Sequence, residues 1–262
     1  MVLKALTIAL SRHLPVSKRC VHVKGHGGAK AAVRQVWQAL PKNLFVLRTD
    51  VKGYYACIDH FLLLDQLAVY IKERKIMNLL SQYLRRCVEW GCLYQDIEKG
   101  ISRGCPLSPL MGVFFLKQLD DELEKSGLFY VRFMDDILVL APTRWKLRGA
   151  VKTLNQVFNV LKLEQHPDKT FIGRIEKGFD SLGYLFHATA LTVATKTIEN
   201  FVTRYHRLYE QKKTAPDVEA VLGDYVQRWR RWVFAALRNE FKQSTLWICG
   251  DERAPALQAL SP

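Results

Sequence analysis

Three aspartates stand at the ends of apolar, strand-like runs of the sequence. Asp50 ends the run 44–51, and Asp135 and Asp136 separate the runs 130–133 and 137–140. An Asp-Asp pair is usually a solvated turn, but these flanking runs are too apolar for that. If the strands are neighbours in one sheet, the three carboxylates converge. Oxygen-only ligands favour Mg²⁺ or Mn²⁺, and two such ions stabilise both oxygens that exchange in phosphoryl transfer. The pattern therefore predicts nucleotidyl transfer.

The chain as a whole is strongly basic. Its 39 Lys and Arg residues exceed its 25 Asp and Glu residues by 14, and its isoelectric point is about 9.6. Seven of these cations lie in the first 40 residues, a segment that contains no acid. Nucleic acid is the partner that such a charge favours most, ahead of an anionic membrane surface.

Within this basic segment, Lys24 and Lys30 flank a run that contains three glycines. Backbone amides in such a turn can cradle phosphate, so both lysines are candidate nucleic-acid contacts. The run lacks the Gly-Lys-Ser/Thr ending of a phosphate-binding loop. A plain glycine turn before the helix that follows explains it equally well.

The composition is that of a folded globular protein. Hydrophobic residues make up 49% and charged residues 24% of the 262-residue chain, which argues against disorder and against a coiled-coil rod. No apolar run approaches the length of a membrane-spanning helix, and residues 1–10 do not resemble a signal peptide. We therefore expect no membrane partner and a cytoplasmic location. The six cysteines lack zinc-site spacing and are expected to be reduced and structural.

Periodicity and turn signals divide the chain into alternating elements. Strand-like runs cover 44–51, 130–133, 137–140, 171–175 and 182–187, and helical patterns cover 33–40, 59–71, 75–90, 110–123, 144–161, 196–213 and 217–241. A turn-rich stretch occupies 100–109, and a tight turn is expected at 178–183. Because strand signals stop near Ala190, we place a domain boundary there.

Several of these segments, in this order, resemble the sequence blocks of a known family. Residues 48–55 resemble the first catalytic block of reverse transcriptases, 100–109 their glycine-rich segment, and 130–136 their double-aspartate hairpin. Residues 161–170 resemble the fourth palm block and 179–184 the primer-grip hairpin, and the helices that follow resemble a thumb. The chain is most similar to bacterial enzymes of the group II intron type and to their intron-like relatives.

This resemblance implies an α+β fold: a polymerase right-hand palm, with an antiparallel sheet and packed helices, followed by an α-helical thumb. The expected domains are partial fingers and palm over 1–190, thumb over 191–242 and a tail over 243–262. The implied activity is RNA-directed DNA polymerisation at a primer 3′-hydroxyl, with two Mg²⁺ ions, or Mn²⁺, as cofactor. The implied partners are an RNA template, a DNA or RNA primer and deoxynucleoside triphosphates, in a bacterial cytoplasm.

The resemblance also assigns roles to individual residues. Asp50 and Asp135 would ligate the metals, with support from Asp136 and from the backbone carbonyl of Val51. Lys169 would donate a proton to the leaving pyrophosphate, and Tyr55 would lie below the sugar and reject a 2′-hydroxyl. The other expected contacts are Arg103 with the triphosphate, and Lys24, Lys30, Phe133, Gly183, Arg228 and Arg231 with nucleic acid.

On the predicted last helix, Arg228 and Arg231 share a face that we expect to lie along the duplex. Trp229 and Trp232 share an apolar side that is expected to pack on the rest of the thumb.

The sequence departs from the family pattern in three places. Phe133 stands where the double-aspartate block usually has Tyr, and Ser102-Arg103 replaces a Pro-Gln pair, so a guanidinium takes the place of an amide. The chain begins roughly where the fingers of its relatives end. Either the sequence is a fragment, or the loop 24–30 and a partner supply the missing cations; a protein or a structured RNA is the expected partner for the missing fingers contacts.

Two alternatives remain open on the sequence alone. The chain could be a nucleic-acid-binding or assembly subunit on a polymerase-like scaffold, inactive alone because its fingers are truncated. Three retained acids weigh against this, because uncompensated acids repel phosphate. A nucleotide cyclase explains the acids but neither the segment 100–109 nor the predicted thumb.

Overall fold

The computed structural model describes residues 1–214 and 217–237. The predicted tail 243–262, the end of the predicted thumb with Arg238, and Cys249 lie outside the described residues. In chain order the elements are α1 (Val2–Leu10), α2 (Gly28–Ala39), the 3₁₀ turn η1 (Leu40–Lys42), β1 (Phe45–Asp50), α3 (Tyr54–Cys57), α4 (His60–Tyr70), α5 (Arg74–Leu84), β2 (Cys87–Trp90), β3 (Leu93–Asp96), α6 (Ser108–Phe115), α7 (Lys117–Lys125), β4 (Phe129–Phe133), β5 (Asp136–Ala141), α8 (Arg144–Leu161), η2 (Pro167–Lys169), β6 (Phe171–Arg174), η3 (Ile175–Lys177), β7 (Phe179–Ser181), β8 (Tyr184–Phe186), β9 (Leu191–Val193), α9 (Thr195–Lys212) and α10 (Val218–Leu237).

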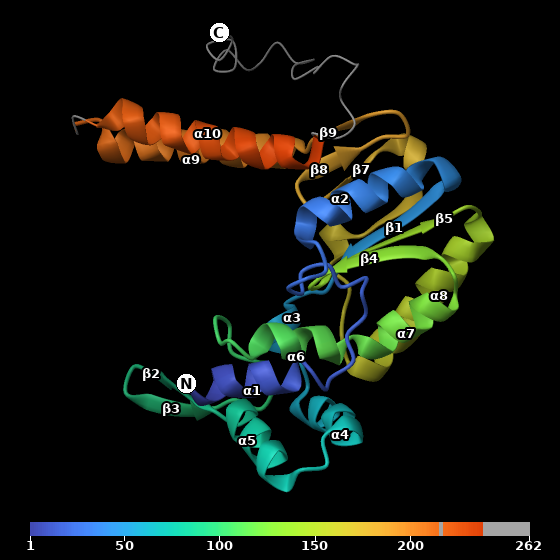
Figure 1. Ribbon diagram of the computed structural model, residues 1–262, viewed down its shortest axis with the longest axis vertical. Coiled ribbons are helices and arrows are strands. Elements are labelled where there is room, and N and C mark those ends of the chain that lie inside the picture. The colour runs from blue at the N-terminus through green and yellow to red at the C-terminus, as the bar shows by residue number, and fades with distance from the viewer. Residues whose placement is uncertain (215–216, 238–262) are drawn as a thin grey trace.

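A four-stranded antiparallel sheet, in the order β4-β5-β1-β6, forms the centre of the molecule. Strands β1, β4 and β5 are mostly buried on both faces, because helices cover both (Figure 1). Val46 of β1 packs in a cluster with Val33 of α2, whereas its neighbour Leu47 packs in a second cluster with Leu154 of α8. Successive side chains of a strand point to opposite faces, so α2 and α8 lie on opposite sides of the sheet. The expected α+β class is confirmed.

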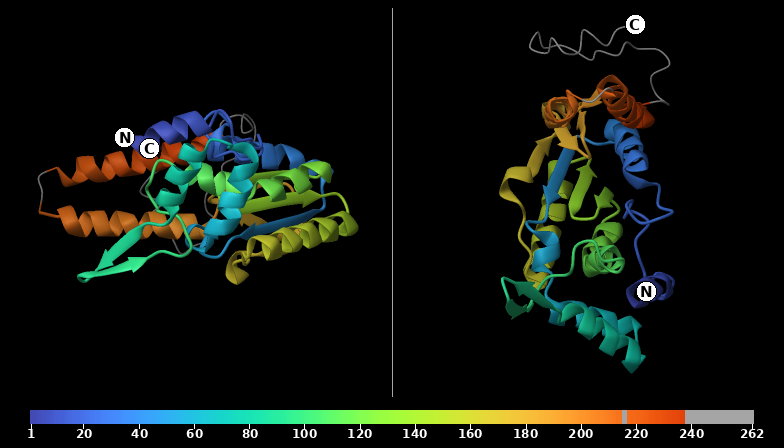
Figure 2. Two further views of the ribbon diagram at one scale, coloured as in Figure 1. Left: turned by 90° about the horizontal axis from the view of Figure 1, so that it is seen from below. Right: turned by 90° about the vertical axis from the view of Figure 1, so that its left-hand side faces the viewer.

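A second, three-stranded sheet of β7, β8 and β9 follows, and it leads into the helical pair α9 and α10. These two helices pack on each other, with Phe201 of α9 stacked on Tyr225 and Trp229 of α10. The C-terminal part of α10 contacts α2. The pair projects from the sheet on the same side as the β2–β3 hairpin (Figures 1 and 2). The predicted helices over 196–213 and 217–241 therefore form one antiparallel unit as far as the structure describes them.

The expected helix over 75–90 is wrong beyond Leu84. The chain forms a hairpin there, in which β2 and β3 pair from Cys87 with Asp96 to Trp90 with Leu93. The two residues of the turn, Gly91 and Cys92, have φ values of 56° and 69°. A two-residue turn with both φ values positive matches the twist of a hairpin, and this local geometry outweighs the helical periodicity.

Three other boundaries differ from the sequence prediction. The expected helix over 110–123 is broken at Leu116 into α6 and α7. Strand β7 occupies part of the expected turn 178–183, so that the turn narrows to Leu182 and Gly183. Strand β9 pairs with β8 through Leu191 and Phe186, so the second sheet continues past the boundary predicted at 190, and the helical pair begins at Thr195.

Among the described residues, no helix is both long and apolar enough to span a bilayer. The cysteines at positions 20, 57, 87, 92 and 105 carry free thiols.

Candidate active site

The structure brings the three aspartates together at one end of β1 and β5, the two central strands of the four-stranded sheet. Asp50 is the last residue of β1 and pairs in register with Asp136, the first residue of β5. Residues directly opposite each other on antiparallel strands project to the same face. Asp135 lies beside them in the two-residue turn that joins β4 to β5. Strand pairing alone therefore collects acids that lie 85 and 86 positions apart in the sequence.

The three carboxylates crowd one another. Burial raises the pKa of Asp135 to about 6, and the charge of Asp50 adds to the rise. Burial also raises the pKa of Asp136 to about 6, although the Arg48 guanidinium opposes this rise. Each charge disfavours ionisation of the next. Any cation that reaches the carboxylates therefore stabilises their charged form.

One such cation is Lys169, whose ammonium donates a hydrogen bond to Oδ2 of Asp50. This hydrogen bond raises the pKa of Lys169. The turn η2 that carries Lys169 is attached to β1 by two further contacts. The His166 amide donates to the Asp50 carbonyl at 2.8 Å, and the hydroxyls of Thr49 and Thr170 are 2.7 Å apart. Lys169 thus lies against the carboxylates, and its expected role as a proton donor near the triphosphate stays a prediction.

A second cation, Arg48, connects the carboxylates to the second sheet. Its Nη1 donates to Oδ1 of Asp180 on β7 at 2.9 Å. Its Nε lies 3.7 Å from Oδ1 of Asp136. Neither of these two buried atoms has a hydrogen-bond partner among the described residues. Asp136 therefore keeps an oxygen that Arg48 approaches without binding.

The donor set has the chemistry of a magnesium or manganese site, since it offers carboxylate oxygens and neither sulfur nor imidazole. Within the part of the chain that the structure describes, no three His, Cys, Asp or Glu side chains are arranged so that they could hold a metal ion as they stand. The Lys169 ammonium already occupies one oxygen of Asp50. The carboxylates therefore match a divalent cation in the chemistry of their donor atoms, but the arrangement of the described residues does not hold one as it stands.

Sequence reasoning missed the residues that hold the turn carrying Asp135. Met134, the first turn residue, has a φ of 57°, in the left-handed region that non-glycine residues rarely adopt. Its amide donates to Nδ1 of His22 at 2.8 Å, and its carbonyl accepts from Nη1 of Arg132 at 2.8 Å. Burial, with Arg132 and His26 adding to it, lowers the pKa of His22 to about 4. The neutral imidazole can therefore accept this hydrogen bond at neutral pH.

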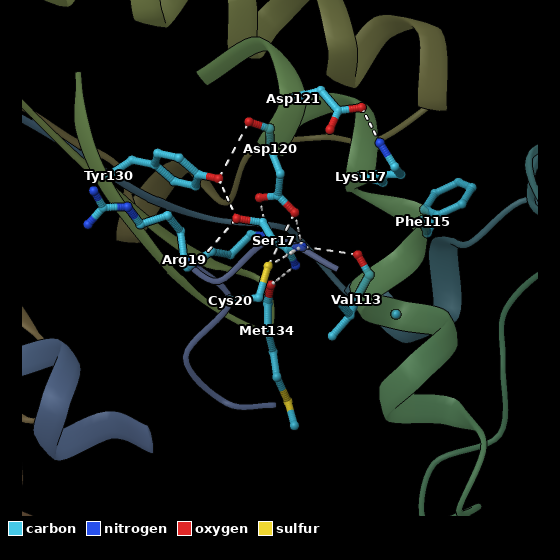
Figure 3. Close-up of polar contacts among 12 residues, drawn as sticks. Ser17, Arg19, Cys20, Val113, Phe115, Lys117, Asp120, Asp121, Tyr130 and Met134 are labelled. Atoms are coloured by element: carbon cyan, nitrogen blue, oxygen red, sulfur yellow. Dashed lines mark hydrogen bonds and ion pairs between the residues drawn. The ribbon is translucent and has the colours of Figure 1, made fainter. Parts of the chain in front are cut away.

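Arg132 is itself held in a buried network. Figure 3 labels its partners Asp120, Cys20, Val113 and Met134. It donates to both carboxylate oxygens of Asp120 on α7, at 2.9 and 2.5 Å. It also donates to the Val113 carbonyl at 3.0 Å and to Sγ of Cys20 at 2.9 Å. A signal was present in the sequence, because an arginine inside an apolar strand is buried only when it is paired. The pairing partner was not marked by any motif.

Tyr55, the predicted sugar-contacting residue, lies next to the same turn. It belongs to α3, and its hydroxyl is 3.7 Å from Sδ of Met134. Burial, followed by the charge of Asp135, raises its pKa. On the other side, a Cβ on Gly112 of α6 would be 3.4 Å from the rings of Tyr54 and Tyr55. The aromatic ring is therefore confined between α6 and the turn.

The glycine-rich segment 100–109 packs against α3. The Gly100 amide donates to the Ile58 carbonyl at 2.7 Å, and the Ile101 amide donates to the Tyr55 carbonyl at 2.7 Å. Gly100 has a φ of 88°, and a Cβ there would lie 2.9 Å from the Ala56 carbonyl. Only glycine allows this approach. Arg103 is exposed in the same segment.

A family model described as reverse transcriptase (RNA-dependent DNA polymerase) matches residues 4–186. The chain belongs to the reverse transcriptase family. The matched range contains the three aspartates, Tyr55, the glycine-rich segment and Lys169. A search of the curated proteins finds no match. Membership of the family indicates a nucleotidyltransferase.

Solved structures with a similar fold include fungal telomerases. Apo telomerase from Candida tropicalis gives a TM-score of 0.58 at 10% identity, covering 89% of this chain and 50% of that one. Apo telomerase from Candida tropicalis truncated from its C-terminal domain gives a TM-score of 0.53 at 14% sequence identity. The match covers 74% of this chain and 44% of that chain. Telomerase from Candida albicans, in complex with a TWJ fragment of telomeric RNA, gives a TM-score of 0.51 at 15% sequence identity. The match covers 91% of this chain and 47% of that chain. The chain thus shares the palm fold of polymerases and spans about half the length of these relatives.

Of the predicted nucleic-acid contacts, Lys30 is engaged with other residues of the protein. Its ammonium donates to the Tyr184 hydroxyl at 2.6 Å and to the Trp232 carbonyl, and it lies 3.7 Å from the centroid of the Trp232 ring. Burial, with Arg34 adding to it, lowers its pKa to about 8. Gly27 is the N-cap of α2. Of the two interpretations of the run 24–30, the glycine turn before a helix describes the structure, while Lys24 remains exposed.

Gly183 and Phe133 also lie at contacts within the protein. Gly183 has a φ of 85°, and a Cβ there would lie 2.8 Å from the Trp232 ring. The Trp232 ring in turn stacks on Tyr184 at 5.0 Å between centroids. Phe133, at the end of β4, makes an edge contact with the His22 ring at 5.6 Å.

In the predicted thumb, Trp229 stacks on Phe201 of α9 at 4.3 Å, which confirms that it packs on the rest of the thumb. Trp232 differs, because it packs on β8 and Lys30 and so fixes the base of α10 to the palm. Arg228 and Arg231 are both exposed, and the Nε of Arg228 donates to the Asp224 carbonyl at 3.2 Å. Both guanidinium groups remain accessible to a ligand.

Proposed function

We propose that the chain is an RNA-directed DNA polymerase, which adds deoxynucleotides to the 3′-hydroxyl of a primer paired with an RNA template. Family membership supports the class of chemistry. The proposal depends above all on one observation: Asp50, Asp135 and Asp136 lie together at one end of the central strands β1 and β5, beside Lys169. A protein that only bound nucleic acid would be weakened by acids grouped in this way.

In this proposal, Asp50 and Asp135 hold two Mg²⁺ or Mn²⁺ ions, and Asp136 and the Val51 carbonyl assist. Bound metal would supply stabilisation of the charge that develops on the attacking and leaving oxygens. The chain's own residues orient the ligands. His22 and Arg132 hold the turn of Asp135, and Arg48 approaches Asp136 from the neighbouring strand.

Lys169 is the proposed proton donor to the leaving pyrophosphate. A lysine ammonium is protonated at neutral pH at its ordinary pKa, and the hydrogen bond to Asp50 raises that pKa further while it is formed. A general acid must carry its proton at the working pH and must reach the reacting oxygen. The side chain is 48% exposed, so it can leave Asp50 without unpacking the core.

The order of the sequence blocks supports an enzyme of the group II intron-like type, in a bacterial cytoplasm. The proposed substrates are an RNA template, a DNA or RNA primer and deoxynucleoside triphosphates, with Arg103 near the triphosphate. Arg228 and Arg231 of α10 would lie along the duplex. A protein or structured RNA is proposed as a further partner that supplies fingers contacts near the loop of Lys24, because Lys30 is engaged within the protein.

Primer extension tests the proposed function. The purified chain is given a labelled primer on an RNA template and on a DNA template, with Mg²⁺ or Mn²⁺, and Asp135→Ala with Asp136→Ala serves as the control. Incorporation that the double substitution abolishes is the expected result. Tight duplex binding without incorporation under any of these conditions would instead favour the nucleic-acid-binding or assembly subunit.

Tyr55→Val is expected to admit ribonucleotides. The smaller side chain opens the space between α6 and the turn where Tyr55 now lies. The preference for deoxynucleotides should fall by at least about ten-fold, the size of effect that a change of a methylene or two has in an apolar pocket. Competition between labelled ribonucleotides and deoxynucleotides measures this preference. Tyr55→Phe keeps the ring and should leave it unchanged, and equal preference in all three proteins would contradict the role.

Divalent metal is expected to raise the midpoint of thermal unfolding, because a ligand that binds only the native state stabilises it by about 2.7 kcal/mol at one hundred times its Kd. The rise should be larger above about pH 7 than at about pH 5, since protonated carboxyls do not bind metal. Without metal, the pKa values of about 6 at Asp135 and Asp136 exceed the ordinary 3.8. The free energy of unfolding should therefore fall as the pH increases from about 4 to about 6.

The matched control for the metal experiment is the double variant Asp50→Asn with Asp135→Asn. Scanning calorimetry should detect no rise with metal in this variant. An equal rise in the variant and in the unmodified chain would place the metal elsewhere.

A further inference from the structure

A groove of about 490 Å³ opens between the first turns of α8 and the edge strand β6. Its floor is apolar and includes Phe45 of β1, Val151 of α8 and Ile172 of β6. Ile172 is 50% exposed, although it lies in a strand of the central sheet. The floor is therefore an apolar surface that water reaches.

Four cations surround this floor. Arg144 and Arg148 come from α8, Arg174 comes from β6, and Lys177 comes from η3. Arg174 lies 3.6 Å from Glu176, with both side chains mostly exposed. Within residues 1–214 and 217–237, the other three cations form no ion pair with an acidic side chain. These four cations, Arg144, Arg148, Arg174 and Lys177, are called the rim of the groove. The rim carries positive charge that the acidic side chains of the described residues leave largely unpaired.

The start of α8 adds to this charge. Its first turn contains no acid, although the positive end of a helix dipole favours acids there and disfavours cations. Arg144 and Lys146 occupy that turn instead. An anionic ligand would relieve the repulsion between these cations and the helix end.

An exposed indole stands beside the rim. The Trp145 side chain is 77% exposed, and the Arg148 guanidinium lies 5.1 Å from the centroid of its ring. Single-stranded nucleic acids bind where cations follow the phosphates and apolar or aromatic side chains meet the base faces. A duplex hides those faces, so an apolar floor between cations suits a single strand better.

The groove is separate from the three aspartates. Phe45 begins β1 and Asp50 ends it, and five residues of strand span about 17 Å. We propose that this groove is a second nucleic-acid site, which binds the phosphates and bases of a single strand outside the polymerase centre. The proposal goes beyond the polymerase activity and does not depend on it.

Fluorescence anisotropy with a short labelled oligouridine tests the proposal, with an excess of unlabelled primer–template duplex present to occupy the polymerase cleft. The groove variant is Arg144→Glu with Arg148→Glu. The control variant is Lys75→Glu with Lys152→Glu, which makes the same change of charge at two exposed lysines that neither line the groove nor lie in the first turn of α8. Labelled oligodeoxyuridine, labelled duplex and vesicles of anionic lipid are tested in parallel.

The groove variant should bind the oligouridine more weakly than the control variant does. The negative slope of log K against log salt concentration should become shallower by about 1.4, at about 0.7 for each of two lost single-strand phosphate contacts. Trp145→Ala should weaken binding with no change of this slope. Comparison of the two oligonucleotides shows whether the site distinguishes RNA from DNA.

Equal binding by the groove and control variants would overturn the proposal, and so would loss of binding to vesicles or duplex in place of the single strand. Primer extension on a short duplex should be the same in the groove variant as in the unmodified chain. If neither the unmodified chain nor any variant extends a primer, but binding of the oligouridine still depends on Arg144 and Arg148, the polymerase proposal fails and the second site stands.

Discussion

Asp135→Asn is expected to reduce the rate of nucleotide incorporation by at least about 10³-fold. Metal-assisted phosphoryl transfer gains several kcal/mol from charge stabilisation, and about 4 kcal/mol corresponds to this factor. Asn keeps the size of the side chain but loses the charge that would hold a cation between Asp50 and the turn. Single-turnover primer extension under saturating nucleotide measures the rate.

This loss should occur without loss of folding or of duplex binding. Burial and the charge of Asp50 raise the pKa of Asp135, so a neutral side chain there removes repulsion and should leave the melting temperature unchanged or higher. Duplex affinity should be equal or tighter, because one charge that repels phosphate is gone. Asp65→Asn changes an exposed acid of α4 and is the matched control. Residual synthesis near the rate of the Asp65→Asn protein would remove Asp135 from the metal site.

The meeting of the three aspartates could be predicted because it depends on local pattern and on one pairing. Apolar runs end at Asp50 and flank Asp135 and Asp136, and antiparallel pairing of β1 with β5 then places the acids together. Helix α8 was predicted with its observed bounds of Arg144 and Leu161, because its apolar positions repeat at three- and four-residue steps that a core on one side requires.

Other features depend on contacts between distant segments, and local pattern does not contain them. The pairing of Lys30 with Trp232 joins residues 202 positions apart, and a lysine in a glycine-rich run looks like a phosphate ligand until that partner is known. The β2–β3 hairpin depends on positive φ at Cys92, which this residue type does not indicate. The position of Lys169 on Asp50 likewise follows from the attachment of η2 to β1.

No sequence motif marks Arg132 or its partner, although the residue is central to a buried network. Arg132→Met is expected to lower the free energy of unfolding by about 3–5 kcal/mol. Its guanidinium is fully buried, as is the Asp120 carboxylate that it binds through two oxygens. Removing one member of a buried pair leaves the other charge uncompensated, which accounts for a cost of this size. Urea denaturation measures it. Arg132→Lys should recover only part of the lost free energy of unfolding, because an ammonium cannot donate two parallel hydrogen bonds to a carboxylate as a guanidinium does.

A second substitution separates this stabilising role from a positioning role at the active site. Replacing both partners, Arg132→Met with Asp120→Leu, removes the buried pair as a unit, and such replacements are often neutral for stability. The double variant should therefore regain most of the free energy of unfolding. It still lacks the donor to the Met134 carbonyl, so the turn of Asp135 keeps only the contact with His22. Nucleotide incorporation should stay low, with the loss in kcat and little change in the KM for nucleotide. If the double variant regained full activity together with its stability, Arg132 would serve the core alone, and His22 would be left as the residue that positions the catalytic turn.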